Sequence, residues 1–283
     1  MLERNFSYIL GCDKTYSESK IVVFGAPFDG TTSYRPGARF ASSAIRSESY
    51  SIETYSPYQD KDLEDIYVFD AGDMELPFGN SVKVLEHIEK FVLKILDDKK
   101  IPFMIGGEHL VSLGAVRSVV KKYKDLHIIH FDAHSDLRDE YLGETLSHAT
   151  VMRRCWDLVG DGRIFQFGIR SGSREEINWG REHVQTCFFN FAQLDKVIET
   201  LKDKPVYFSI DLDVLDTSVF PGTGTPEAGG VTFCELLDAV KKVSKLNIVG
   251  LDMTELAPPL DPTGASTSLA CKLLREILLY IFK

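Results

Sequence analysis

The feature that most constrains the fold is a regular alternation of apolar runs with amphipathic segments. Eight short runs of β-branched, aromatic and aliphatic residues occur along the chain, and most are continuous rather than interrupted by polar residues. Continuous runs are typical of strands covered on both faces, as in a parallel sheet flanked by helices. The predicted strands are Ile21–Phe24, Ile66–Phe69, Ile101–Ile105, Leu126–Phe131, Arg163–Gly168, Thr186–Phe189, Val206–Ile210 and Ile248–Leu251.

Between these runs lie segments whose apolar residues recur every three or four positions, which is the period of an amphipathic helix. The predicted helices are Val82–Leu96, Leu110–Tyr123, Glu175–His183, Phe191–Leu201, Phe233–Val243 and Ser266–Phe282. Eight strands with interposed helices predict an α/β fold with a doubly wound, mostly parallel sheet in a single domain, residues 1–283. The one long irregular stretch, residues 28–61, is expected to shape a site.

Composition narrows the class of protein. A formal charge of -10 argues against a nucleic-acid partner, whose phosphates need a basic face, and it favours a cationic substrate. The chain shows no leader segment and no apolar run long enough to cross a bilayer, so we expect a soluble cytoplasmic protein with no membrane partner. The five cysteines lie far apart, as is typical of small buried side chains in a reducing compartment.

Three short stretches supply residues that can bind metal ions. They are Gly106-Gly107-Glu108-His109, Asp132-Ala133-His134-Ser135-Asp136 and Asp211-Leu212-Asp213, and each follows a predicted strand. Glu255 follows a fourth strand by a few residues. Ligands of parallel α/β sheets bind beyond the carboxyl ends of the strands, so we expect these side chains to converge at one edge.

The spacing within the stretches favours metal binding. Alternate residues of an extended segment point the same way, so Asp132, His134 and Asp136 can converge on one ion without a helix. Carboxylate and imidazole ligands without thiolates suit Mn²⁺ best, with Fe, Co, Ni or Zn as alternatives. Two such ions about 3.5–4 Å apart would lower the pKa of a shared water and orient it for hydrolysis.

Other polar residues near the strands have ordinary structural interpretations. His127 and His130 lie within a predicted strand and are interpreted as core histidines or as partners of a metal ligand. The segment Asp70-Ala71-Gly72-Asp73 also follows a strand, and its spacing predicts a turn, with lining of a channel as the alternative.

Taken together, the motifs resemble the ureohydrolase family of arginases and agmatinases over nearly the whole chain. The matching segments are FDGTTSYRPGAR at 28–39, GGEH at 106–109, HFDAHSD at 130–136, SHAT at 147–150, SIDLDVLD at 209–216 with PGTGTPEAGG at 221–230, and DMTEL at 252–256. The resemblance implies a three-layer α/β/α fold, two Mn²⁺ ions per subunit, and a homotrimer or homohexamer.

The resemblance also implies the metal ligands. They are, in chain order, His109, Asp132, His134, Asp136, Asp211 and Asp213. Asp132 and Asp211 would bridge the two ions, while His109 and Asp136 complete the ligands of one ion and the remaining histidine and aspartate those of the other.

Three catalytic roles follow from the same resemblance. His148 matches the position of the family's proton shuttle, which would protonate the leaving amine. Glu255 lies where a carboxylate would pair with the guanidinium of the substrate, so both residues would also bind substrate. Asp136 would accept a hydrogen bond from the attacking water and help to aim it. The products would be urea and an amine.

The segment at 28–39 resembles agmatinases more than arginases, which implies that agmatine is converted to putrescine, a step of polyamine synthesis. The loop beyond Asp136 leaves alternatives open. Its acids Asp139, Glu140 and Glu144 would suit the polyamine tail of N1-aminopropylagmatine. Arg138 could meet the acidic tail of a guanidino acid, although its acidic neighbours favour internal pairing. A single-metal deacetylase and a catalytically idle homologue are the rival classes.

Overall fold

The computed structural model describes residues 7–282 and contains an eight-stranded sheet. Its strands are β1 (Ile21–Ala26), β4 (Val68–Asp73), β5 (Ile101–Gly106), β6 (His127–Phe131), β7 (Ile164–Ile169), β8 (Gln185–Phe188), β9 (Pro205–Asp211) and β10 (Asn247–Thr254). They are ordered β4-β1-β5-β10-β9-β6-β7-β8, and all neighbouring pairs are parallel. The short strands β2 (Tyr55–Ser56) and β3 (Lys61–Asp62) pair antiparallel beside it. The eight predicted strands are confirmed.

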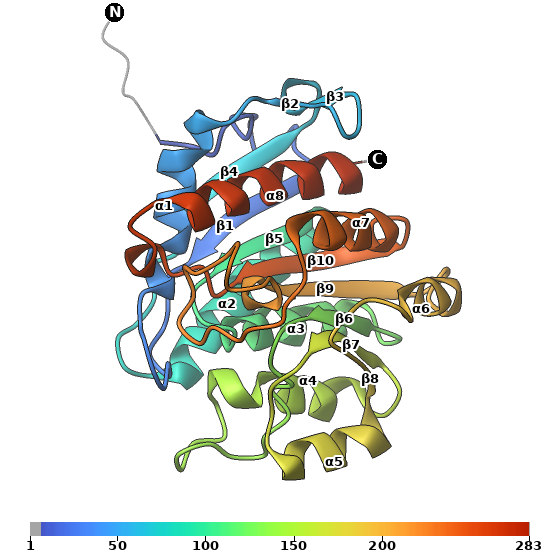
Figure 1. Cartoon of the computed structure of the whole chain (residues 1–283). Coiled ribbons are helices and arrows are strands. Elements are labelled where there is room, and N and C mark those ends of the chain that lie inside the picture. The colour runs from blue at the N-terminus through green and yellow to red at the C-terminus, as the bar shows by residue number, and fades with distance from the viewer. Residues whose placement is uncertain (1–6, 283) are drawn as a thin grey trace, which may run out of the picture.

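Helices cover both faces of the sheet (Figure 1). They are α1 (Ala41–Glu48), α2 (Ser81–Asp97), α3 (Val111–Lys122), α4 (Val151–Val159), α5 (Arg174–His183), α6 (Leu194–Thr200), α7 (Phe233–Val243) and α8 (Ala265–Ile281). The buried side chains of α1, α6, α7 and α8 share one core with the sheet, and those of α2, α3 and α4 share the other. The three-layer α/β/α architecture is therefore confirmed.

Burial explains why the strands are continuous apolar runs. Every residue of β1 and of β7 is buried, because each strand has a helical layer on either side. Helix starts are also encoded locally. The hydroxyl of Ser173 and the carboxylate of Glu176 form reciprocal hydrogen bonds at the start of α5, and Thr232 with Glu235 does the same for α7.

Two expectations about the first third of the chain are wrong. Residues 28–61 are not irregular throughout, because α1 lies within them. The segment 70–73 is not a turn but the end of β4. Its two carboxylates bind the guanidinium of Arg46 from α1, with Arg46 Nε 2.8 Å from Asp70 Oδ2. That buried ion pair joins the helix to the strand.

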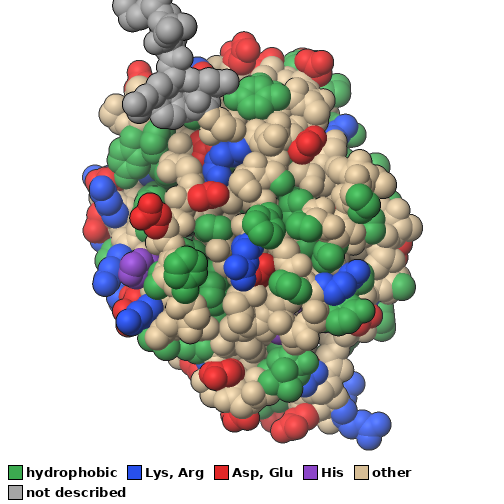
Figure 2. Space-filling view, turned by 90° about the vertical axis from the view of Figure 1, so that its left-hand side faces the viewer, with side chains coloured by type: hydrophobic (Ala, Val, Ile, Leu, Met, Phe, Trp, Pro, Cys, Tyr) green, Lys and Arg blue, Asp and Glu red, His purple; other side chains and the backbone are tan. Residues whose placement is uncertain are grey.

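The carboxyl ends of the parallel strands all reach one edge of the sheet, at the left of Figure 1. Figure 2 views this edge and shows acidic and basic side chains interspersed across it. Among residues 7–282, no helix combines the length and the apolar composition that crossing a membrane requires.

Candidate metal centre and substrate pocket

Four neighbouring strands at the middle of the sheet carry the residues singled out by sequence. The loop after β5 holds His109, Asp132 follows β6 directly, Asp211 is the last residue of β9, and Glu255 follows β10 directly. These strands are adjacent in the order β5-β10-β9-β6, so their ends lie side by side. The structure brings all six sequence-predicted ligands to this edge, where most of them line one pocket.

One half of the cluster surrounds the ring of His109. Its Nδ1 lies 3.0 Å from Asp136 Oδ2, 3.1 Å from Asp132 Oδ2 and 3.5 Å from Asp211 Oδ2. A single ring nitrogen thus faces three carboxylate oxygens, far more negative charge than one N–H proton can balance. This set of donors fits a cation placed among them.

The other half of the cluster surrounds His134. Its Nδ1 lies 2.9 Å from Asp213 Oδ2 and 3.5 Å from Asp132 Oδ1. Asp132 therefore turns one oxygen toward each histidine, which is the geometry of a bridging carboxylate. The backbone holds this half in place, since Asp211 Oδ1 accepts a hydrogen bond from the Asp213 N–H at 2.9 Å.

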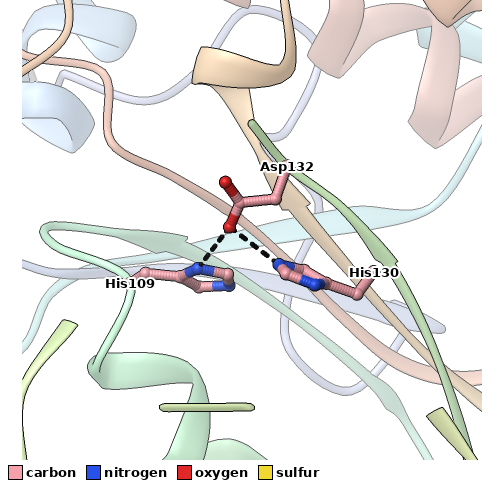
Figure 3. A group of neighbouring side chains, drawn as sticks. All are labelled: His109, His130 and Asp132. Carbon is pink, nitrogen blue, oxygen red and sulfur yellow. Dashed lines mark hydrogen bonds and ion pairs between the residues drawn. The ribbon is translucent and has the colours of Figure 1, made fainter. Parts of the chain in front are cut away.

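His130 adds a third imidazole beside the shared carboxylate (Figure 3). In Figure 3 the rings of His109 and His130 approach the same oxygen of Asp132, and His130 Nε2 lies 2.8 Å from it. The other ring nitrogen of His130 lies 3.1 Å from the Gln166 side-chain nitrogen. Because both its nitrogens have protein partners and the residue is fully buried, the interpretation of His130 as a partner of a metal ligand fits the structure.

Burial and mutual repulsion make the ionised cluster costly without cations. Burial, together with the charges of Asp213 and Asp132, raises the pKa of Asp211 well above its usual value. Burial alone would lower the pKa of both His109 and His134, but hydrogen bonds and charges of the surrounding carboxylates outweigh it and raise both. Without cations, His109, His134 and Asp211 therefore hold protons more tightly than they would in water. The charge of the cluster and its mixed oxygen and nitrogen donors fit two divalent ions.

Two buried glutamates lie beside the cluster. Glu255 Oε1 accepts a hydrogen bond from the His109 N–H at 2.7 Å, and burial and the charge of Glu108 raise the pKa of Glu255 well above its usual value. The backbone at Glu255 is held in the left-handed region, with φ of 62°, as is that of Asp136 at 53°. Such strained positions occur where the surroundings fix a side chain for function.

Sequence reasoning assigned no role to Glu108, which anchors the loop over the pocket. This fully buried carboxylate accepts hydrogen bonds from the Thr31 N–H at 2.8 Å and from the Thr32 hydroxyl at 3.2 Å. Burial raises its pKa to about 7 against these hydrogen bonds. The sequence did carry a sign of this role, because Glu108 is a charged residue between Gly107 and a predicted ligand, just after an apolar strand.

His148 lies at the side of the pocket, in the 3₁₀ turn His148–Thr150 before α4. Its Nε2 is 3.2 Å from the Ser33 hydroxyl, and its backbone N–H donates to Thr31 Oγ1 at 3.1 Å. Nδ1 is buried and bonds to none of the described residues. Burial lowers the pKa of the imidazole, so His148 is neutral at pH 7 and free to take up a proton.

The pocket has a volume of about 170 Å³, and five of the six proposed ligands line it. Its wall includes Arg138, Tyr141 and Glu176, but none of the three acids of the 139–144 loop. The expectation that Arg138 pairs with its acidic neighbours is wrong. Its Nε lies 3.5 Å from Glu176 Oε1 and its guanidinium lies over the Tyr141 ring, whereas Asp139 binds Arg154 at 2.6 Å.

Comparisons with known proteins agree with this arrangement. The model of the arginase family matches residues 19–280. The chain is 48% identical over 270 residues to the agmatinase of Bacillus cereus, which covers 94% of this chain and 93% of that protein. It is 39% identical over 260 residues to the N(1)-aminopropylagmatine ureohydrolase of Thermococcus kodakarensis, a match that covers 89% of this chain and 88% of that protein. The crystal structure of agmatine ureohydrolase of Thermoplasma volcanium superposes with a TM-score of 0.90 at 36% identity. The superposition covers 98% of this chain and 95% of that one.

Proposed function

Because the chain belongs to the arginase family, we propose that it hydrolyses agmatine to putrescine and urea at a pair of manganese ions. The observation that carries the proposal is the carboxylate of Asp132, which lies between the two histidine-centred halves of the cluster. The similarity to agmatinases along nearly the whole chain supports the choice of a guanidino substrate.

The metal assignment rests on the donors of this cluster. His109 and Asp136 would hold one ion, His134 and Asp213 the other, and Asp132 would be shared. Asp211 would be the second shared ligand, since it approaches His109 and accepts a hydrogen bond from the backbone of Asp213. When bound, two divalent ions supply a water activated for attack near neutral pH. Manganese is proposed because all the donors are oxygens and imidazole nitrogens, a set that zinc, cobalt, nickel and iron also accept.

Glu255 would fix the plane of the substrate. A planar guanidinium presents paired N–H donors, and a carboxylate accepts two of them in parallel. The raised pKa of Glu255 reflects a buried carboxylate without a cation. A guanidinium against it would favour the ionised form and so strengthen the ion pair. The hydrogen bond from the backbone of His109 keeps this carboxylate at the base of the pocket.

His148 would move the proton that the reaction requires. An alkylamine leaves readily only once its nitrogen is protonated, so a proton must travel from the attacking water to that nitrogen. A neutral imidazole can accept the proton and then donate it, and burial keeps His148 neutral near pH 7. Asp136 is buried beside His109 at the base of the same pocket, where its carboxylate would help to aim the attacking water.

The tail of the substrate would extend past Arg138 and Glu176, which offer one charge of each sign. N1-aminopropylagmatine is the second candidate substrate, because a relative with 39% identity is named for that reaction. A guanidino acid is a third, since Arg138 could turn from Glu176 to a carboxylate. The acids Asp139, Glu140 and Glu144 do not line the pocket, so the polyamine tail would need another partner.

A substrate panel tests the proposal. Manganese-loaded protein is assayed for urea release from agmatine, N1-aminopropylagmatine, arginine, guanidinobutyrate and guanidinopropionate, and kcat/KM is compared. We expect the highest kcat/KM for agmatine. The absence of urea from both agmatine and its aminopropyl derivative would refute these two proposed substrates. Elemental analysis provides a second criterion, because one ion per subunit instead of two would favour the single-metal deacetylase class.

The remaining proposals concern the state of the protein in the cell. We propose one catalytic domain over residues 1–283, a homotrimer or homohexamer, and a cytoplasmic role in polyamine synthesis. The resemblance to arginases and agmatinases supports these proposals. Light scattering coupled to size-exclusion chromatography measures the mass of the assembly, for which a monomer of 31.8 kDa would contradict the proposed oligomer.

A further inference from the structure

A chain of buried polar side chains leads from His109 away from the pocket into the sheet. His109 Nε2 lies 2.9 Å from the hydroxyl oxygen of Ser209, and that hydroxyl donates to Asp252 Oδ1 at 2.7 Å. The phenol of Tyr207 donates to the other oxygen of Asp252. Ser209 and Asp252 are direct partners across β9 and β10, so the sheet itself sets their separation.

The proton count along this chain places a proton on Nε2 of the His109 ring. Ser209 has one hydroxyl proton, which it donates to Asp252. The bond between Ser209 and His109 must therefore use a proton on Nε2 of the ring. A neutral ring that carries its proton on Nε2 has its lone pair on Nδ1, the nitrogen that faces Asp132 and Asp136. That lone pair would be available to a metal ion.

We infer that Asp252, acting through Ser209, is a positioning residue that holds His109 as a metal ligand. The inference rests on the proposed metal centre. The ring of His109 is 1% exposed and both of its nitrogens have partners, so its rotation about the side-chain bonds is restricted from both ends. Carboxylates that act on the far nitrogen of a ligating histidine raise its basicity and its affinity for the metal.

Among the residues that the structure describes, none gives comparable support to the histidine of the other half. His134 Nε2 lies 4.0 Å from Glu227 Oε1, beyond hydrogen-bond distance, and the side chains are 24% and 42% exposed. The two proposed metal positions thus differ in how firmly their histidines are held. Removal of the Ser209 link should therefore weaken the ion held by His109 and leave the ion held by His134 nearly unchanged.

The hydrogen bond between Ser209 and Asp252 is not needed to hold β9 and β10 together. β9 and β10 are joined by parallel pairing from Asn247 to Thr254, which does not depend on these side chains. A carboxylate buried in a sheet is costly, and an apolar pair would fill the same space at lower cost. Asp252 accepts a hydrogen bond at each of its two oxygens, and the chain of hydrogen bonds that begins at Asp252 ends at a proposed metal ligand.

The test compares Ser209→Ala, Asp252→Asn and the double variant with the wild type. Manganese binding is followed by calorimetry, metal content by elemental analysis, and the metal pair by electron paramagnetic resonance. We expect one of the two Kd values, that of the ion held by His109, to rise about 10- to 100-fold in Ser209→Ala while the other changes little. The spin-coupled spectrum of the pair should give way to that of an isolated ion. If Asp252 acts through Ser209, the double variant binds no more weakly than Ser209→Ala.

A matched control is Ser118→Ala, which also removes a buried serine hydroxyl, here one that bonds to the backbone of Glu89 outside the site. Thermal melts of the metal-free proteins show which variants fold, and Asp252→Asn, nearly isosteric, serves if Ser209→Ala does not fold. Unchanged manganese affinity in folded Ser209→Ala and Asp252→Asn would overturn the inference alone. A wild-type protein that binds no manganese would instead refute the proposed function, and with it the inference.

Discussion

Replacement of His148 by alanine should slow turnover strongly without removing the metals. The side chain of His148 contacts Ser33 and lies beside the ring of Tyr141, and it bonds to none of the proposed ligands. General acid–base catalysis by one side chain contributes about 10²–10⁴-fold to a rate. We therefore expect kcat to fall by that factor, which corresponds to about 2.7–5.4 kcal/mol in the activation free energy.

The cost in stability should be small by comparison. The imidazole forms one hydrogen bond, to an exposed serine, worth about 1 kcal/mol. The assay is urea release under single-turnover conditions, with metal content measured on the same samples. The matched control is His127→Ala, because this half-buried histidine also has a pKa lowered by burial but lies outside the pocket and donates to the backbone of Asp125. It should leave kcat unchanged.

The pH dependence gives a second measurement of the same assignment. Burial lowers the pKa of His148 below its usual value near 6.5, so the neutral form is lost only as the pH falls below that value. The kcat/KM of the wild type should therefore decline on the acid side below about pH 6.5. His148→Ala should lack this part of the decline. Full activity of the variant, or an unchanged acid limb, would show that another group carries the proton.

Three further variants test other parts of the structure. Asp213→Ala should lose one metal per subunit by elemental analysis, because it removes the carboxylate nearest His134. Arg46→Leu should destabilise the protein by about 3–5 kcal/mol in urea denaturation, since it leaves the buried Asp70 without its cation; a change under about 1 kcal/mol would contradict this. Arg138→Gln should raise kcat/KM for agmatine relative to guanidinobutyrate, because it removes a positive charge from the pocket wall, and an unchanged ratio would exclude a role in tail recognition.

The strands could be predicted because their apolar runs are long and buried on both faces. Two helices could not. The buried face of α1 includes the polar residues Ser42 and Arg46, the latter paired with Asp70 of β4, so no apolar period marks the helix. The nine-residue α4 has buried side chains at helical spacing, but a segment this short is a weak signal in the sequence.

The residues of the site also divide into those that could be predicted from the sequence and those that could not. The proposed ligands could be predicted because parallel strands place their carboxyl ends at one edge, whatever the rest of the fold does. The partners of Arg138 could not, because Glu176 comes from α5, far along the chain, and only the tertiary structure brings it close. Asp252 and Ser209 lie in the matching segments 252–256 and 209–216 but received no role, since only the pairing of β9 with β10 shows that they are neighbours.

The strained backbone at Glu255 and Asp136 implies a conflict between folding and turnover at these two positions. A side chain in the left-handed region costs about 1–3 kcal/mol, which glycine would not incur. Glycine at either position should therefore relieve the backbone while it removes a carboxylate from the pocket. Folding alone would favour glycine there, so the protein accepts a cost in stability to keep a carboxylate at each of these two positions.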